Sequence, residues 1–118
     1  MRITEVDFGN GTPIDGYGPT FFRVGGEVVE GAALVLPGGV TPWAGYDDPA
    51  PILDATEAID FLILGTGPHI AHPPTAFRTA LEAAGIGVES MASAAACRTY
   101  NVLLSEGRRV GAALLPAG

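Results

Sequence analysis

Lysine is absent from the sequence, and positive charge of any kind is scarce. All six basic residues are arginines, against 13 aspartates and glutamates, which gives a formal net charge of −7. The excess is local, because residues 1–60 carry ten acids and two arginines, whereas residues 61–118 carry three acids and four arginines. A nucleic acid would be repelled by the first part and only weakly attracted by the second, so we expect no nucleic-acid partner.

Cysteine and long apolar runs are also in short supply. A single cysteine, Cys97, excludes an intramolecular disulfide and fits a reducing compartment. No apolar run approaches the roughly 20 residues that cross a bilayer, so we expect no membrane insertion. Residues 1–7 alternate apolar and polar side chains, unlike the continuous apolar segment of a signal peptide. These absences together predict a cytoplasmic protein.

The residues that are present have the composition of a chain that folds around a core. Hydrophobic residues make up 47% of the 118 positions and charged residues 16%, unlike a disordered chain. The length is that of one domain, and the sequence contains neither a long linker nor an internal repeat. We therefore predict a single domain over residues 1–118.

Short strands separated by glycine and proline are expected in the first half. The pair Gly25 and Gly26 supplies the positive φ angles of a tight hairpin turn between strands over residues 21–24 and 27–36. Further short strands are predicted over residues 3–8 and 40–43, with an irregular connection at 14–18. This half therefore reads as an antiparallel hairpin or meander.

The glycine pair also predicts the hairpin register. A two-residue turn at this point places Phe22 opposite Val29 and Arg23 opposite Val28. Glu30 then becomes a diagonal neighbour of Arg23 on the same face, where the two could form an ion pair.

The second half changes from period two to alternating strands and helices. We expect a short helix over 52–58, strands over 59–64, 86–91 and 109–115, and helices over 75–84 and 94–104, the last with Ser93 as its N-cap. The order strand, helix, strand, helix, strand predicts a βαβαβ unit. The fold class is α/β, with a mixed central sheet, helices packed on it and an N-terminal antiparallel hairpin element. The predicted core consists of Phe61, Ile63, Phe77, Leu81, Val88, Tyr100, Leu103 and Leu114.

A glycine loop, Gly65, Thr66 and Gly67, follows the buried strand and precedes a helix. Such a loop can offer backbone N–H groups to an anion, so these residues are a candidate ligand or anion loop. The dinucleotide fingerprint needs a third glycine where Ile70 stands, and the P-loop needs a lysine that the chain lacks. The pattern therefore favours a structural turn over a nucleotide cradle.

The two histidines, His69 and His72, lie two residues apart in a proline-rich loop. A metal centre needs a third or fourth ligand at comparable spacing, and the sequence supplies none. We predict no metal site, no cofactor and no assigned catalytic residue.

The helix over 94–104 carries the other candidate residues. Cys97 lies near its start beside Arg98, where a thiol could be activated, although a small buried core residue is the simpler interpretation. Arg98, Asn101 and Ser105 fall at i, i+3 and i+7 and form a polar stripe. Cys97, Arg98, Asn101 and Ser105 are therefore our candidate interaction or functional edge, with a solvated helix face as the alternative.

The second half resembles a known family. The resemblance rests on four sequence segments: FLILGTG at 61–67, GIGVESM at 85–91, AAACRTYNVLL at 94–104 and GRRVGAALL at 107–115. They are similar to the Mth-type domain, a family of small single-domain proteins of unknown function. Its eukaryotic members include a mitochondrial complex I assembly factor and an adipogenesis-associated protein. The resemblance spans essentially the whole chain and implies an α/β fold with a mixed sheet and an extra antiparallel element. It implies no established reaction or cofactor.

These observations leave more than one functional hypothesis open. The first is a non-catalytic bacterial interaction protein that helps assemble a larger complex, of the membrane-associated respiratory kind that the resemblance implies. The alternatives are a small-ligand or anion-binding protein, or an enzyme, that uses the Gly65, Thr66, Gly67 loop with Cys97, Arg98 or Asn101 of the following helix. A protein partner is expected under the first hypothesis, and weak self-association is compatible with it. The sequence favours a non-enzyme without deciding the matter.

Overall fold

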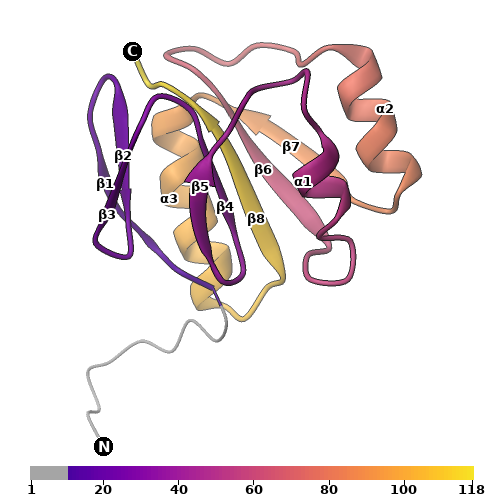
Figure 1. Ribbon diagram of the computed structural model, residues 1–118, viewed down its shortest axis with the longest axis horizontal. Coiled ribbons are helices and arrows are strands. Elements are labelled where there is room, and N and C mark those ends of the chain that lie inside the picture. Colours follow the sequence, from indigo (N-terminus) through magenta and orange to yellow (C-terminus); the bar gives the residue numbers. More distant parts are fainter. Residues whose placement is uncertain (1–10) are drawn as a thin grey trace, which may run out of the picture.

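The computed structural model describes residues 11–118, and the strand predicted over residues 3–8 lies outside this range. Two sheets form, one of three strands in the order β1-β2-β3 and one of five in the order β5-β4-β8-β6-β7 (Figure 1). The elements are β1 (Ile14–Tyr17), β2 (Phe21–Val24), β3 (Glu27–Glu30), β4 (Ala33–Leu36), β5 (Gly39–Pro42), α1 (Ala50–Leu53), β6 (Phe61–Thr66), α2 (Thr75–Ala83), β7 (Gly87–Met91), α3 (Ser93–Ser105) and β8 (Val110–Leu115).

The larger sheet is mixed, as predicted. Strand β6 pairs in parallel with both β7 and β8, whereas β4 pairs antiparallel with β5 and β8. The order β6, α2, β7, α3, β8 is the predicted βαβαβ unit, and the three-stranded antiparallel sheet precedes it. The predicted fold class is confirmed.

The hairpin register is also confirmed. Phe22 lies opposite Val29 and Arg23 opposite Val28. Gly25 and Gly26 have φ angles of +57° and +84°, which the tight turn requires. The expected ion pair with Arg23 does not form within residues 11–118, where the Glu30 carboxylate accepts a hydrogen bond from Thr20 Oγ1 at 3.4 Å.

Two predicted segments of the first half are wrong in detail. Residues 14–18 are not an irregular connection, because Ile14–Tyr17 forms β1 and pairs with β2 through a bulge. The single strand expected over 27–36 is two strands, β3 and β4, separated at Gly31, whose φ is +80°. The positive φ turns the chain out of the small sheet and into the large one, a switch that an apolar pattern does not record.

The short helix of the connection is also displaced. It covers Ala50–Leu53, with Pro51 in its first turn, and turns follow where the sequence predicted helix to 58. Its single buried side chain, Ile52, has no exposed surface. This single turn therefore contributes one side chain to the core on its side of the large sheet.

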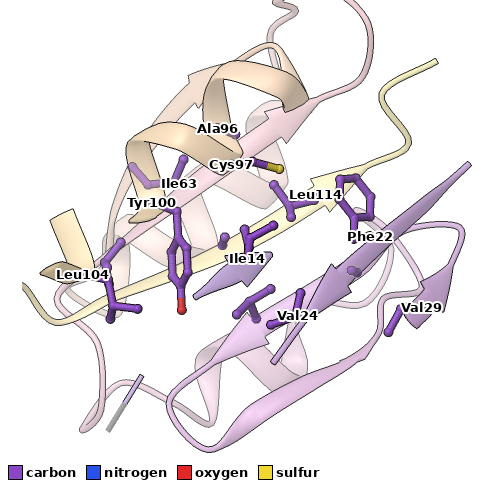
Figure 2. Packing of buried hydrophobic residues seen from close by; sticks show 14 residues of the cluster. Ile14, Phe22, Val24, Val29, Ile63, Ala96, Cys97, Tyr100, Leu104 and Leu114 are labelled. Atoms are coloured by element: carbon purple, nitrogen blue, oxygen red, sulfur yellow. The ribbon is translucent and has the colours of Figure 1, made fainter. Parts of the chain in front are cut away.

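The large sheet is buried on both faces. Within β6, Ile63 points to one face and Leu62 and Leu64 to the other, as a continuous apolar strand predicts. On one face, α3 and the small sheet meet in what we call the α3-side core, which contains Ile14, Phe22, Val24, Val29, Ala33, Val35, Ile63, Ala96, Cys97, Tyr100, Leu104, Val110, Ala112 and Leu114. Figure 2 shows side chains of α3 and of the small sheet meeting over one face of the large sheet.

The opposite face is covered by α1 and α2. This α2-side core contains Leu34, Trp43, Ile52, Ile59, Leu62, Leu64, Phe77, Leu81, Ile86, Val88 and Ala113. Of the eight predicted core residues, six are buried, while Phe61 and Leu103 are half-buried at the margin of the α3-side core.

Candidate functional site

The glycine loop lies where β6 meets the start of α3. Gly65 is buried, and a Cβ added to it would lie 2.7 Å from Ser93 Oγ and 2.9 Å from Leu114 Cδ2. Gly67 has a φ of +104°, a conformation that L side chains rarely adopt. Both glycines are therefore explained by the close approach of α3 and by the turn that leaves the strand.

The hydroxyl of Ser93 holds this junction together. It accepts a hydrogen bond from Gly67 N at 2.9 Å and donates one to Leu115 O at 2.6 Å, while Ser93 N donates to Gly67 O at 2.8 Å. Ser93 has no exposed surface, so water could not replace Gly67 N or Leu115 O as a partner of its hydroxyl if either moved away. One side chain thereby connects the ends of β6, α3 and β8.

The prediction that Ser93 is the N-cap of α3 is wrong. Ala92 occupies the cap position, and no side chain caps the helix. Because the Gly67 N–H is buried and needs an acceptor, Ser93 Oγ serves the neighbouring loop instead of its own helix.

Thr66 organises the loop that follows. Its Oγ1 lies 2.7 Å from His69 O and 3.1 Å from Met91 O, and it accepts a hydrogen bond from Ala71 N at 3.0 Å. The hydroxyl has one proton to donate, and the shorter distance favours His69 O. The Thr66 hydroxyl and the Gly67 N–H, which an anion would use, are therefore already hydrogen-bonded within the protein.

His69 and His72 are both exposed in this loop. Within residues 11–118, no group of three or more histidine, cysteine, aspartate or glutamate side chains is arranged to hold a metal ion.

The four candidate residues of α3 do not share a surface. Cys97 is 4% exposed in the α3-side core, and burial raises the pKa of its thiol to about 11, against a smaller lowering by the Arg98 charge. Figure 2 shows its sulfur among the core side chains. A protonated, buried thiol has little nucleophilic character at neutral pH.

Asn101 is half-buried and pairs with the main chain of β1. Its Oδ1 accepts a hydrogen bond from Ile14 N, and its Nδ2 donates one to Ile14 O, both at 2.8 Å. The preceding residue, Tyr100, is buried and donates its hydroxyl to Thr12 O at 2.9 Å. We expected Asn101 on a polar interaction edge, with a solvated helix face as the alternative, but its amide fastens the small sheet to α3.

The exposed part of α3 keeps two residues of the expected stripe and adds an apolar one. Arg98 and Ser105 are at the surface, and the Ser105 hydroxyl donates to Val102 O of its own helix at 2.7 Å. Val102, one turn after Arg98, is 55% exposed. The sequence-based stripe missed this apolar side chain, although its i+4 spacing from Arg98 would have placed it there.

A pocket that no motif indicated lies between α2, β7 and the loop after β6. Its volume is about 350 Å³, and Ile70, Ala71, His72, Arg78, Val88, Glu89 and Ser90 line it. The Oγ of Ser90 is buried and has no hydrogen-bond partner among residues 11–118. Arg78 Nη2 donates to Val88 O at 3.3 Å, and Arg78 Nε contacts Glu82 Oε2 at 3.1 Å. The pocket thus combines apolar, cationic and hydroxyl groups beside an edge strand.

Taken together, the mixed sheet, the added antiparallel sheet and the sealed glycine loop define a small α/β domain whose sequence-predicted polar groups mostly hold its own elements in place. A family model for proteins of unknown function, DUF498/DUF598, matches residues 14–115. The chain belongs to this family.

Relatives and solved structures agree with this assignment. An uncharacterized protein of Rhodobacter capsulatus is 50% identical, covering 98% of this chain and 94% of that protein. The NADH dehydrogenase [ubiquinone] 1 alpha subcomplex assembly factor 3 of Danio rerio is 31% identical over 98% of this chain and 71% of its own length. The Mth-type resemblance is confirmed.

Two solved structures share the fold closely. The crystal structure of an outer membrane protein from Bartonella henselae superimposes with a TM-score of 0.81 at 32% identity, covering 91% of this chain and 96% of that one. The solution structure of a Mth938-like domain from Bordetella pertussis gives 0.76 at 28% identity, covering 100% and 94%. Within residues 11–118 of our chain, no helix has the length and apolar character to cross a membrane.

Proposed function

We propose that the protein is a non-catalytic interaction protein that assists the assembly of a larger, membrane-associated respiratory complex. The observation that carries this proposal is its relationship, over 98% of the chain, to a protein named as an assembly factor of NADH dehydrogenase. The match covers 71% of that assembly factor, so the proposal places the assembly role in the shared domain. A shared fold alone would not support it, because one fold serves many functions.

The geometry of the candidate residues supports the same proposal. Main-chain groups of the protein already form hydrogen bonds with the hydroxyls of Ser93 and Thr66 and with the amide of Asn101. Groups used in this way position helices and strands and are not available to a substrate. The ligand-binding alternative at Gly65, Thr66 and Gly67 ranks second for this reason.

Genetic complementation tests the assembly role. We expect a Rhodobacter capsulatus strain that lacks its 50% identical protein to contain less assembled NADH dehydrogenase on native gels, and we expect this chain to restore the level. A matched strain carrying an empty vector is the control. Normal amounts of the assembled enzyme in the deletion strain would contradict the proposal.

Titration tests the alternative. Since the Gly67 N–H and the Thr66 hydroxyl are engaged, we expect ATP, NAD and FAD to bind no more tightly than millimolar. Micromolar binding of any of them that Gly67→Ala abolishes in a folded variant would favour a ligand-binding protein. Turnover of a hydrolase or transferase substrate that disappears in Cys97→Ala would favour an enzyme.

A further inference from the structure

Strand β7 forms one edge of the five-stranded sheet. Gly87 N donates to Asp60 O at 3.2 Å, and Gly87 and Glu89 are the partners of Phe61 and Ile63 in the parallel ladder. Because N–H and C=O groups alternate in direction along a strand, those of Val88 and Ser90 point away from β6. Within residues 11–118, no main-chain group bonds to this side of β7.

The Arg78 side chain confirms that the main-chain groups of Val88 point away from β6, and it occupies one of them. Its Nη2 donates to Val88 O, which therefore faces outward. The guanidinium is at the surface, with 44% of the side chain exposed, so it can move aside. The N–H groups of Val88 and Ser90 and the C=O of Ser90 remain for another strand.

The opposite edge of the sheet is protected. Strand β5 ends at Pro42, which has no N–H to donate, and it packs against β3 of the small sheet. Strand β7 contains no proline and carries one charged residue, Glu89. An edge without such protection is a ready template for an additional strand.

The pocket described above opens along this same edge. Its lining includes three consecutive residues of β7 and none of β6. Ile70, which is 70% exposed, contributes an apolar wall, and the Ser90 Oγ lies buried beside the pocket without a hydrogen-bond partner in the described part of the chain. A side chain from a strand placed beside β7 would enter the pocket from the α2 side.

We propose that the outer edge of β7 binds an extended segment of a partner protein, which adds a strand to the sheet and places a side chain in the pocket. This inference rests on the proposed function, for which it names the contact surface. Main-chain hydrogen bonds to Val88 and Ser90 supply affinity, and the pocket supplies selectivity. The Glu89 carboxylate, which forms no ion pair within residues 11–118, favours a lysine or arginine opposite it.

Alternation along the added strand gives the segment a pattern. A basic residue that faces Glu89 lies on the α3 side of the sheet, so the residues on either side of it point toward α2 and the pocket. Because Ile70, Ala71 and Val88 form the apolar part of the pocket lining, the segment should read apolar, basic, apolar. A second copy of this chain fits less well, because full antiparallel overlap of two β7 strands sets Glu89 against its own counterpart.

A peptide library tests the proposal on the intact chain. Random decapeptides displayed on phage are selected against the protein, and the best binders are synthesised. We expect them to share the apolar, basic, apolar pattern and to slow amide exchange of Val88 and Ser90 at least tenfold. Protection confined to α3 or to the small sheet would overturn the proposal, as would failure to select any binder.

Variants at one position separate the edge from the rest of the surface. Ser90→Pro removes an N–H that β6 does not use, so we expect a folded protein with at least tenfold weaker peptide binding. The matched control Ser90→Ala keeps the N–H and should weaken binding by a few-fold at most. Glu89→Arg should reverse the selected charge and remains decisive if the proline variant fails to fold. Equal binding by all these variants would overturn the proposal.

Two further results would overturn it independently. Slow exchange of the Val88 and Ser90 amides in the free chain, as a monomer or as a dimer, would mean that the edge is already occupied. Full complementation of the deletion strain by the Ser90→Pro variant would mean that the assembly role does not require the outer edge of β7. Normal assembly in the deletion strain contradicts the proposed function, whatever the peptides do.

Discussion

The amide of Asn101 is the most informative group to remove. The side-chain amide forms two hydrogen bonds of 2.8 Å, with the main-chain N–H and C=O of Ile14, as a neighbouring strand would. The two residues are 87 positions apart in the sequence. Each such bond contributes about 1 kcal/mol net, and a buried group left without a partner costs more. Since the site is half-buried and water can replace part of the loss, we expect Asn101→Ala to lower the free energy of unfolding by about 2–3 kcal/mol.

Urea unfolding followed by circular dichroism measures this effect. Ser105→Ala is the matched control, because it lies one turn further along α3 with its hydroxyl bonded to Val102 O of the same helix. It should change the free energy of unfolding by less than about 0.5 kcal/mol. Asn101→Asp should also destabilise the protein, because a carboxylate oxygen then replaces the amide donor facing the Ile14 carbonyl.

Amide exchange locates the loss. If Asn101 fastens the small sheet to α3, exchange in β1 and β2 should accelerate more than exchange in β6 and β8. A loss below about 0.5 kcal/mol, or one without faster exchange in β1, would refute this reasoning and restore Asn101 to the exposed polar stripe that the sequence predicted.

Three further perturbations follow from the packing. Gly65→Ala should cost about 1–3 kcal/mol, because the added methyl would lie 2.7 Å from Ser93 Oγ, whereas in Gly87→Ala the nearest atom is 3.4 Å away and thermal melting should change little. Leu81→Ala, at a side chain with no exposed surface, should cost about 2–5 kcal/mol in urea unfolding, and a loss under half a kilocalorie would mean that α2 presents another face. Burial raises the pKa of the Cys97 thiol from 9.0 to about 11, so the unfolded chain releases this proton at lower pH and stability should fall between pH 9 and 11. Cys97→Ala, compared by urea unfolding across that range, should lack this part of the decline, and parallel curves would contradict the assignment.

Some parts of the fold could be predicted because their causes lie within a few residues. Gly25 and Gly26 determine the turn, and the turn determines which residues of β2 and β3 face each other. The helical spacing of Phe77 and Leu81 identifies the buried face of α2 without reference to any other element. The continuous apolar run of β6 required cover on both faces of the sheet, and α3 and α2 provide it.

The candidate site was less predictable, because hydrogen-bonding side chains choose partners by distance in space. Ser93 looked like an N-cap because the nearest N–H groups in sequence belong to its own helix. In the folded chain, its Oγ instead accepts a hydrogen bond from Gly67 N. The amide of Asn101 looked solvated because helical spacing could not show that β1 arrives beside it. The glycine loop was predicted to be a structural turn, but the close approach of Ser93 that explains Gly65 appears only in the structure.

What the sequence alone determined, then, is the alternation of strands and helices in the second half, the hairpin register and the mixed character of the sheet, since these follow from local backbone preference and the period of apolar residues. It did not show β1 or the break between β3 and β4. Tertiary structure decided which strand lies at which edge, because strand order depends on packing between segments far apart in the chain. It therefore also decided that, among residues 11–118, the outer edge of β7 with its Val88 and Ser90 amides stays unpaired and adjoins the pocket beside α2.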